Sequence, residues 1–294
     1  MGLLSHIADS SQKKQKAGLL AKAENAKKND IHSFQEWASR NGFEHCGVFS
    51  QIHGMMVLTN AYGINSHTIA NSVSSKDFWN GTLNTEQRIY NYKKTDQEFY
   101  NFVQFFPFEI RSSISGISFI KAGENKNFSI VMIFSINSEK EINITDEMIK
   151  SLNLNSAVKN SDFSKFEDDI IENTKQSAFL LYSLDIDEAI NNSIKSIQLP
   201  EETIRNAVTD CIFKQSFDLV TKAFPKPNFV SQNNNGKIRL AVLDNGSFDD
   251  LLLQSHINLM LNDLLCDSEI KPTLINCGTS NDSEKIISFL NHSA

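Results

Sequence analysis

Glycine, proline and cysteine are scarce in this sequence. Its 294 residues include 12 glycines, 5 prolines and 4 cysteines, and neither the phosphate-binding pattern G-x-x-x-x-G-K-S/T nor the dinucleotide-binding pattern G-x-G-x-x-G occurs. Cys46, Cys211, Cys266 and Cys277 form no C-x-x-C pair, which excludes a thioredoxin-like redox motif and a paired-cysteine zinc site. Each lies in or beside an apolar run, as expected of reduced thiols in the cytoplasm.

Long apolar runs are also missing. No segment reaches the roughly 20 apolar residues of a membrane-spanning helix, and polar residues interrupt the start of the chain where a secretion signal would be apolar. The first six residues resemble a myristoylation signal, except that His6 stands where serine or threonine is required. We therefore expect a soluble cytoplasmic protein, with peripheral membrane contact only through residues 1–28.

Metal and nucleophile patterns are incomplete. His45, Cys46, His53 and His67 lack the short paired spacing of zinc ligands, and His45 and Cys46 should point to opposite faces of one strand. The segment Ser113–Gly116 lacks the first glycine of a G-x-S-x-G nucleophile turn. We therefore predict no catalytic residue and no metal ligand here, and the sequence does not indicate a cofactor.

Charge is distributed unevenly. The net charge of −7 argues against nucleic-acid binding, yet residues 1–28 carry +4 and the remainder −11. Within residues 1–28, Gly2-Leu3-Leu4 recurs as Gly18-Leu19-Leu20 in a lysine-rich background. This pattern predicts a basic amphipathic helix that docks on a protein or a membrane surface. The alternative is a frayed tail with a solvated basic face.

Residues 30–150 have the periodicity of a first domain with mixed α/β structure. We predict an antiparallel sheet built from two hairpins and covered by helices. Phe99, Phe102, Val103 and Phe106 lie at i, i+3, i+4 and i+7 of a helix that should pack on the sheet. The predicted helices cover 30–41, 65–73, 95–106 and 145–152, and the predicted strands cover 46–49, 55–62, 114–122 and 128–136.

The segment Val57–Gly63 resembles the second strand and following turn of GAF-type sensor domains, and the resemblance extends over residues 31–150. PAS-like and roadblock-like folds share a similar order of elements. In GAF domains a glycine at the position of Gly63 permits the sharp exit from strand to helix, where positive φ is needed. The resemblance implies a pocket for a small ligand or a dimerising surface, with Tyr62 as the aromatic residue of the turn.

Ser74–Trp79 is the most site-like surface segment. It sets the aromatic pair Phe78 and Trp79 beside the charged pair Lys76 and Asp77, without strong periodicity, as in protein contacts. Together with Tyr62, these four residues are our candidate ligand-binding or partner-binding residues. The alternative is a lid on the core, which burial of Trp79 would indicate.

Residues 151–176 are polar and read as a linker with a helical piece at 163–171, and residues 177–294 read as a second, smaller α/β domain. We predict strands at 178–184, 238–243 and 273–277 and helices at 200–224, 247–264 and 283–290. The strand ending at Asp185 resembles the first strand of GGDEF-type nucleotide cyclases, which implies a magnesium-binding role for Asp185. The glycine-rich acidic hairpin of that family is missing. Its nearest counterpart, Asp244–Phe248, has neither the double glycine nor the paired acidic residues. The resemblance therefore implies an inactive copy.

Three functions follow from these patterns. The leading hypothesis is a non-enzymatic signalling or regulatory protein that senses a small ligand or binds a protein, including a second copy of itself. The second is a divergent nucleotide-cyclase-like or other phosphoryl-transfer domain using Asp185 and Asp187. The third is a structural adaptor without a ligand. An enclosed polar pocket in the first domain would favour sensing, converging carboxylates near Asp185 would favour an enzyme, and a filled interior would favour an adaptor.

Overall fold

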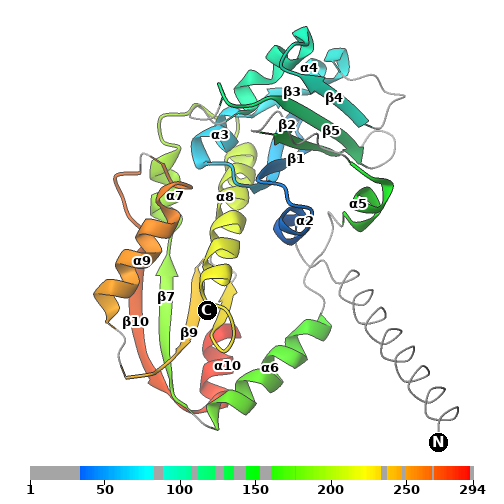
Figure 1. Ribbon diagram of the computed structural model, residues 1–294. Helices are drawn as coiled ribbons and strands as arrows, with labels where there is room; N and C mark the ends of the chain where they lie inside the picture. The colour runs from blue at the N-terminus through cyan, green and yellow to red at the C-terminus, as the bar shows by residue number, and fades with distance from the viewer. Residues whose placement is uncertain are drawn as a thin grey trace, which may run out of the picture.

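The computed structural model describes residues 34–82, 89–106, 111–122, 129–135, 144–152, 160–175, 177–232, 237–246, 249–266 and 268–291. In this part of the chain two antiparallel sheets are joined by a long helix, α8 (Glu202–Ala223), which runs from the first sheet along the second (Figure 1). The mixed α/β class that the sequence predicts is therefore confirmed. The basic helix predicted for residues 1–28 lies outside the described residues.

The first sheet has six strands, and every neighbouring pair is antiparallel. Both predicted hairpins are present. The short strands β3 and β4 were not predicted, since each offers too few alternating apolar residues. In spatial order the strands are β3 (Ser74–Ser75), β2 (Met55–Tyr62), β1 (His45–Ile52), β6 (Ser129–Ser135), β5 (Gly116–Ala122) and β4 (Ile89–Lys93).

Two turns in the β1–β2 region require residues that can adopt positive φ. His53 and Gly54 both have positive φ, 48° and 82°, and Ile52 pairs with Met55, which is the geometry of a two-residue type I′ hairpin. Gly63 has a φ of 66°, and a Cβ there would lie 2.2 Å from the carbonyl oxygen of Glu44. The prediction that Gly63 needs positive φ is confirmed, and the close approach to Glu44 adds a second reason for glycine.

Helices cover both faces of the first sheet. On one face lie α2 (Phe34–Arg40) and α5 (Asp146–Ser151), held together by the Trp37 indole N–H, which donates to the carbonyl of Met148 at 2.9 Å. On the other face lie α3 (Ser66–Asn71), α4 (Lys76–Thr82) and η1 (Gln97–Phe105).

The helix predicted for residues 95–106 does pack on the sheet, but η1 is a 3₁₀-helix and not an α-helix. With three residues per turn, side chains three apart share one face. Phe99, Phe102 and Phe105 are accordingly all buried. The 3.6-residue period assumed from the sequence selects Phe99, Phe102 and Phe106, which are buried, but it does not select Phe105, which is buried as well.

The second sheet has four strands, again antiparallel throughout. With α8 and α9, they follow the β-α-β-β-α-β order of the split βαβ motif. The four-residue β8 and the short helix α7 (Asp187–Ser193) were not predicted from the sequence. In spatial order the strands are β10 (Thr273–Ser280), β7 (Phe179–Asp185), β9 (Ile238–Leu243) and β8 (Phe229–Gln232).

The segment interpreted as a linker contains α6 (Asn160–Thr174). Ile170 of α6 is buried with Ile286 and Leu290 of α10 (Ser283–Asn291) against Phe179 and Phe229 of the second sheet. The opposite face of this sheet is covered by α7, α8 and α9 (Asp250–Asn262). The helical piece predicted at 163–171 is thus present, and it is part of the second layered unit.

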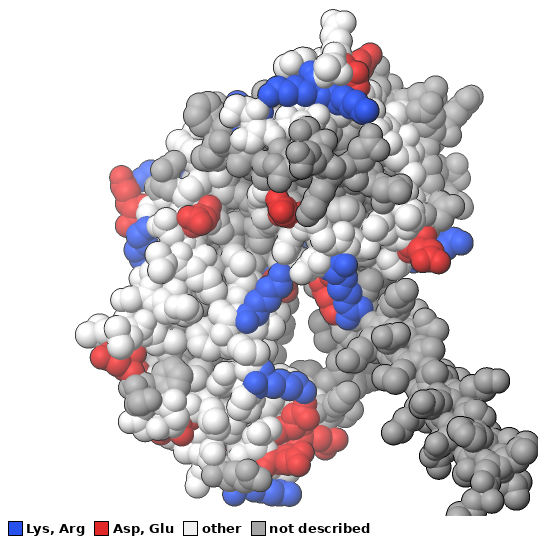
Figure 2. Space-filling model, in the orientation of Figure 1, with Lys and Arg blue, Asp and Glu red and all other residues white. Residues whose placement is uncertain are grey.

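Charged side chains are interspersed on the face shown in Figure 2, and acidic and basic residues do not gather there into one large patch of a single sign. Among the described residues, no helix combines the length and apolarity needed to cross a bilayer.

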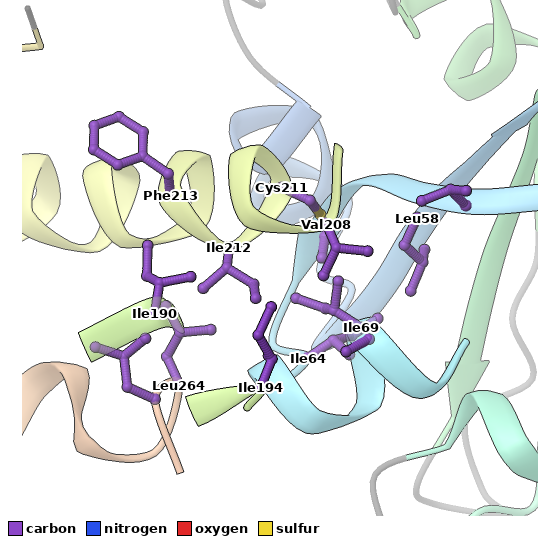
Figure 3. Packing of buried hydrophobic residues seen from close by; sticks show 14 of the residues in the cluster. Leu58, Ile64, Ile69, Ile190, Ile194, Val208, Cys211, Ile212, Phe213 and Leu264 are labelled. Carbon is purple, nitrogen blue, oxygen red and sulfur yellow. The ribbon is translucent and has the colours of Figure 1, made fainter. Parts of the chain in front are cut away.

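The two sheets share one hydrophobic core. Residues of α8 and α7 pack directly against residues of β2, α3 and the chain between them (Figure 3). Gln215 of α8 is buried and completes the joint with two bonds, because its Nε2 donates to the carbonyl of Ile64 at 2.6 Å and its Oε1 accepts from the Ile64 N–H at 3.3 Å. The Ser66 N–H also donates to the carbonyl of Leu264 at 2.8 Å. The apolar residues labelled at this joint are Leu58, Ile64, Ile69, Ile190, Ile194, Val208, Cys211, Ile212, Phe213 and Leu264.

Candidate functional site

The segment Ser74–Trp79 is a short strand followed by the first residues of α4, and not the irregular loop that the sequence indicated. Trp79 is 1% exposed. Its indole N–H donates to Ser74 Oγ at 2.9 Å, and its ring stacks on Phe105 at 5.1 Å. Phe78 contacts Phe102 edge-on at 5.5 Å. Trp79 therefore belongs to the core, as in the lid alternative, and Phe78 is partly buried against it.

The other candidate residues do not join them. Lys76 and Asp77 lie in the first turn of α4, with Asp77 exposed and its N–H donating to Ser75 Oγ at 3.2 Å. Tyr62 packs against the cluster on the α2 face of the sheet. Its ring lies 4.7 Å from Lys222 Nζ of α8, a cation–π contact. Tyr62 and Trp79 are on opposite faces of the first sheet, so the five candidates form no common site.

The interior between η1 and the first sheet is filled by aromatic rings. Phe102 and Phe119 approach to 4.3 Å between ring centres, and Trp79 contacts Phe49 at 4.9 Å and Phe119 at 5.5 Å. Such tilted and edge-to-face pairs are the stable arrangements of packed rings. The aromatic cluster is thus packed core, as expected of a helix that packs on the sheet.

The histidine and cysteine at the start of β1 are separated by the sheet. His45 Nδ1 lies 2.6 Å from the carbonyl oxygen of Gly63, and Cys46 is buried on the α2 face. Burial raises the pKa of the Cys46 thiol well above its usual range, which makes it an inert packing residue.

Asp185 ends β7, and its carboxylate is neutralised by Lys237, whose Nζ lies 3.0 Å from Asp185 Oδ2. The Asp187 N–H donates to Asp185 Oδ1 at 3.3 Å. Burial, and then the charge of Asp185, raise the pKa of Asp187, while Lys237 opposes the shift. Within the described residues, no three His, Cys, Asp or Glu side chains come close enough to hold a metal ion.

Asp244 does not face Asp185. Since β7 and β9 are antiparallel, with Phe179 opposite Leu243 and Leu184 opposite Ile238, Asp244 lies beside the start of β7 while Asp185 lies at its end. Asp244, the first residue of the nearest counterpart of the missing acidic hairpin, is therefore too far from Asp185 to share a site with it. A strand of this length separates the two carboxylates by roughly 20 Å, and Lys237 occupies the position next to Asp185.

The least expected feature is the outer surface of α9. Leu251, Leu252 and Leu259 are 77%, 70% and 76% exposed, although an exposed leucine normally stands alone. They follow one side of the helix, at spacings of seven and eight residues. The opposite side buries Leu253, Ile257 and Leu261. Figure 2 shows the flank over α9 as a largely uncharged surface with acidic side chains at its lower end.

β10 lies next to α9 and forms the edge of the second sheet. Among the described strands it pairs with β7 alone, and most of its side chains are exposed, Ile275 to 47%. An edge strand presents backbone N–H and C=O groups to which another strand can pair. We define the outer α9 surface as Leu251, Leu252, Leu259 and β10. In this surface, exposed apolar side chains lie next to backbone groups that can pair with another strand.

A hydrogen-bonded carboxylate holds α9 in this position. Asp250 Oδ1 accepts from the Tyr182 hydroxyl at 2.7 Å, and Asp250 Oδ2 accepts from Asn276 Nδ2 at 2.9 Å. These bonds lower the pKa of Asp250, and burial raises that of Tyr182. Asp249 caps the helix by accepting from the N–H groups of Leu251 and Leu252. The sequence predicts the helix start at Ser247 and does not reveal this network, because its members lie on three separate elements.

No protein-family model matches the sequence, and no curated protein matches it at a significant level.

Proposed function

We propose that the protein is a non-enzymatic regulatory module that acts by binding another protein through the outer α9 surface. The exposure of three leucines on one helix, beside an edge strand, carries this proposal. Burying a leucine side chain contributes roughly 1.5–3 kcal/mol, so a partner that covers all three gains substantial binding energy. Clustered apolar exposure of this kind marks interaction surfaces.

The filled interior of the first sheet supports protein binding over small-ligand sensing. A GAF-like pocket needs space between the sheet and its helices, and aromatic rings from η1 and α4 take up that space. The β1–β2 hairpin and the Gly63 turn support a GAF-like origin for residues 31–150. We propose that this part of the chain serves as a scaffold for the joint with α8.

Phosphoryl transfer is the alternative proposal, and Asp185 and Asp187 are its basis. Two-metal chemistry needs several carboxylates that converge on the substrate phosphates. The ion pair of Asp185 with Lys237 favours a structural role for this carboxylate. We also propose a cytoplasmic location, because Cys46 and Cys211 are buried thiols and Cys277 is an exposed one, as is usual in a reducing compartment.

Site-specific photo-crosslinking tests the proposed surface. A photoreactive amino acid replaces Ser255, which is exposed between the leucines, in the full chain produced in cells. The same probe at Tyr100, 57% exposed on η1, is the matched control. We expect a protein adduct at position 255 and none at position 100.

Each captured protein is then purified, and its affinity is measured for the wild type and for Leu251→Ser/Leu259→Ser. We expect at least a tenfold loss of affinity in the variant, because two of the three apolar contacts are removed. No adduct at position 255, or an unchanged affinity, would disprove the proposal.

A further inference from the structure

The chain contains an apolar segment of its own whose charge is opposite to that of α9. Residues 244–271 carry six acidic residues and one basic residue, Lys271. Asp249, Asp250 and Asp263 are exposed at the two ends of α9, and α9 itself contains no lysine or arginine. Residues 1–28 carry +4 and place leucines among lysines. The charge of residues 1–28 is thus complementary to that of α9 and its flanking residues, and both segments carry leucines.

The apolar spacing also fits. Leu251 to Leu259 span about 12 Å along α9, at 1.5 Å per residue. Each copy of the repeated Gly-Leu-Leu segment offers three apolar residues within about one helical turn, namely Leu3, Leu4 and Ile7, and Leu19, Leu20 and Ala23. Either copy is long enough to cover the leucines of α9, and its lysines would then flank the acidic ends.

Residues 24–33 are long enough to act as the tether. Ten residues span at most about 35 Å when extended. α2, which begins at Phe34, lies close enough to α8 for the charge of Glu36 to raise the pKa of Asp218, and α9 packs on α8 from its own side. Packed helices lie about 8–10 Å apart, so the extended tether is more than three times as long as one such step.

We propose that residues 2–23 of this chain bind along the outer α9 surface and cover it, with residues 24–33 as the tether. The inference rests on the proposed function, because it makes the same surface a regulated one. A partner must displace the chain's own basic segment to reach the leucines. The attraction between this basic segment and the acidic ends of α9 is electrostatic, so it weakens as salt screens the charges. Covering is therefore strongest at low ionic strength.

The test places the photoreactive amino acid at Ser255 in the purified full-length protein and maps the attachment sites by mass spectrometry. We expect attachment within residues 2–23 in a product with the mass of one chain. The yield should fall at least threefold when salt is raised from about 0.05 M to about 0.5 M, where the screening length drops severalfold. A mixture of isotopically light and heavy chains distinguishes attachment within a chain from attachment between chains.

A matched pair of variants separates covering from folding. Leu3→Ser/Leu4→Ser/Leu19→Ser/Leu20→Ser should reduce the yield at least fivefold, whereas Ser10→Ala/Ser11→Ala should not change it. Attachment to α9 or β10 of a second copy, or to no part of residues 2–23 at low salt, would overturn the inference. If purified chains give no such attachment while the adduct in cells persists, covering fails and the proposed function stands. If both are absent, both fail.

Discussion

The two sheets use their large apolar side chains in opposite ways. Around the first sheet, Trp79 and the phenylalanines of η1 turn inward and fill the space between sheet and helices. On the second sheet, α9 buries one side and presents Leu251, Leu252 and Leu259 to solvent. The comparison shows that a helix with apolar residues on all sides can have one side buried in the core and the other exposed to solvent. The exposed half then becomes the candidate for function.

The largest expected effect is on the filled side of this comparison. Phe102→Ala should lower the free energy of unfolding by about 3–5 kcal/mol, because it removes a fully buried ring and leaves a cavity. Tyr100→Ala, on the same 3₁₀-helix but exposed, is the control and should stay within about 0.5 kcal/mol of the wild type. Urea denaturation measures both. An unchanged midpoint for Phe102→Ala would remove η1 from the core.

The next effect concerns the joint between the two regions. Gln215→Ala should cost about 2–4 kcal/mol, since it leaves the buried N–H and C=O of Ile64 without their side-chain partner. Lys214→Ala, one residue away and exposed, serves as the control. Thermal unfolding should give one transition at a lower temperature. Two separate transitions in the wild type would show that the sheets unfold independently, contrary to a shared core.

The third effect is a pH dependence of the stability, which we expect to arise from Asp218 of α8. Burial, and then the charge of Glu36, raise the pKa of Asp218 to about 6, against the opposing effect of Lys222. The folded state therefore keeps a proton that the unfolded state has lost, and stability contributed by Asp218 declines as the pH rises from about 4 to about 6.

Asp218→Asn should accordingly raise the melting temperature relative to the wild type more at pH 7 than at pH 4. Glu36→Gln should lower the pKa of Asp218, because it removes one of the charges that raise it. The pH range over which Asp218 affects the stability should then be narrower. Melting temperatures measured across this range decide the matter, and a difference between variant and wild type that does not change with pH would contradict the assignment.

The smallest expected effect is at Asp185. The protein should form no product from GTP or ATP with magnesium, because Lys237 neutralises Asp185 and Asp244 lies at the other end of the sheet. Product chromatography measures turnover, with Asp185→Asn as the comparison. Turnover that disappears in Asp185→Asn would make phosphoryl transfer the better proposal.

Features with a strong local cause could be predicted from the sequence. The His53-Gly54 hairpin, the positive φ of Gly63 and the long helix α8 depend on turn chemistry or on sustained periodicity. The strands β4 and β8 carry too few alternating apolar residues for a periodic signal. The inward turn of Trp79 depends on a hydrogen bond with Ser74, which the order of residues does not reveal.

The candidate site was harder to predict than the fold, since exposure depends on distant neighbours. Seven of the 13 residues of α9 are apolar, so its pattern is also compatible with a buried helix. The exposed face exists because the sheet ends at β10 and no described element packs outside it. Asp185, in contrast, was placed correctly at a strand end, but its neighbour could not be identified without the register of β7 and β9.

The core shared through α8 has a consequence for how the molecule responds to ligands. Gln215 of α8 bonds to Ile64 beside the first sheet, and one hydrophobic core contains residues of both sheets. Unfolding of either sheet would therefore expose the core of the other. A ligand with dissociation constant Kd and free concentration [L] therefore adds RT ln(1 + [L]/Kd) to the stability of the entire assembly, wherever it binds. A partner held at α9 should slow protease cleavage in the first sheet, which makes local proteolysis a remote reporter of occupancy.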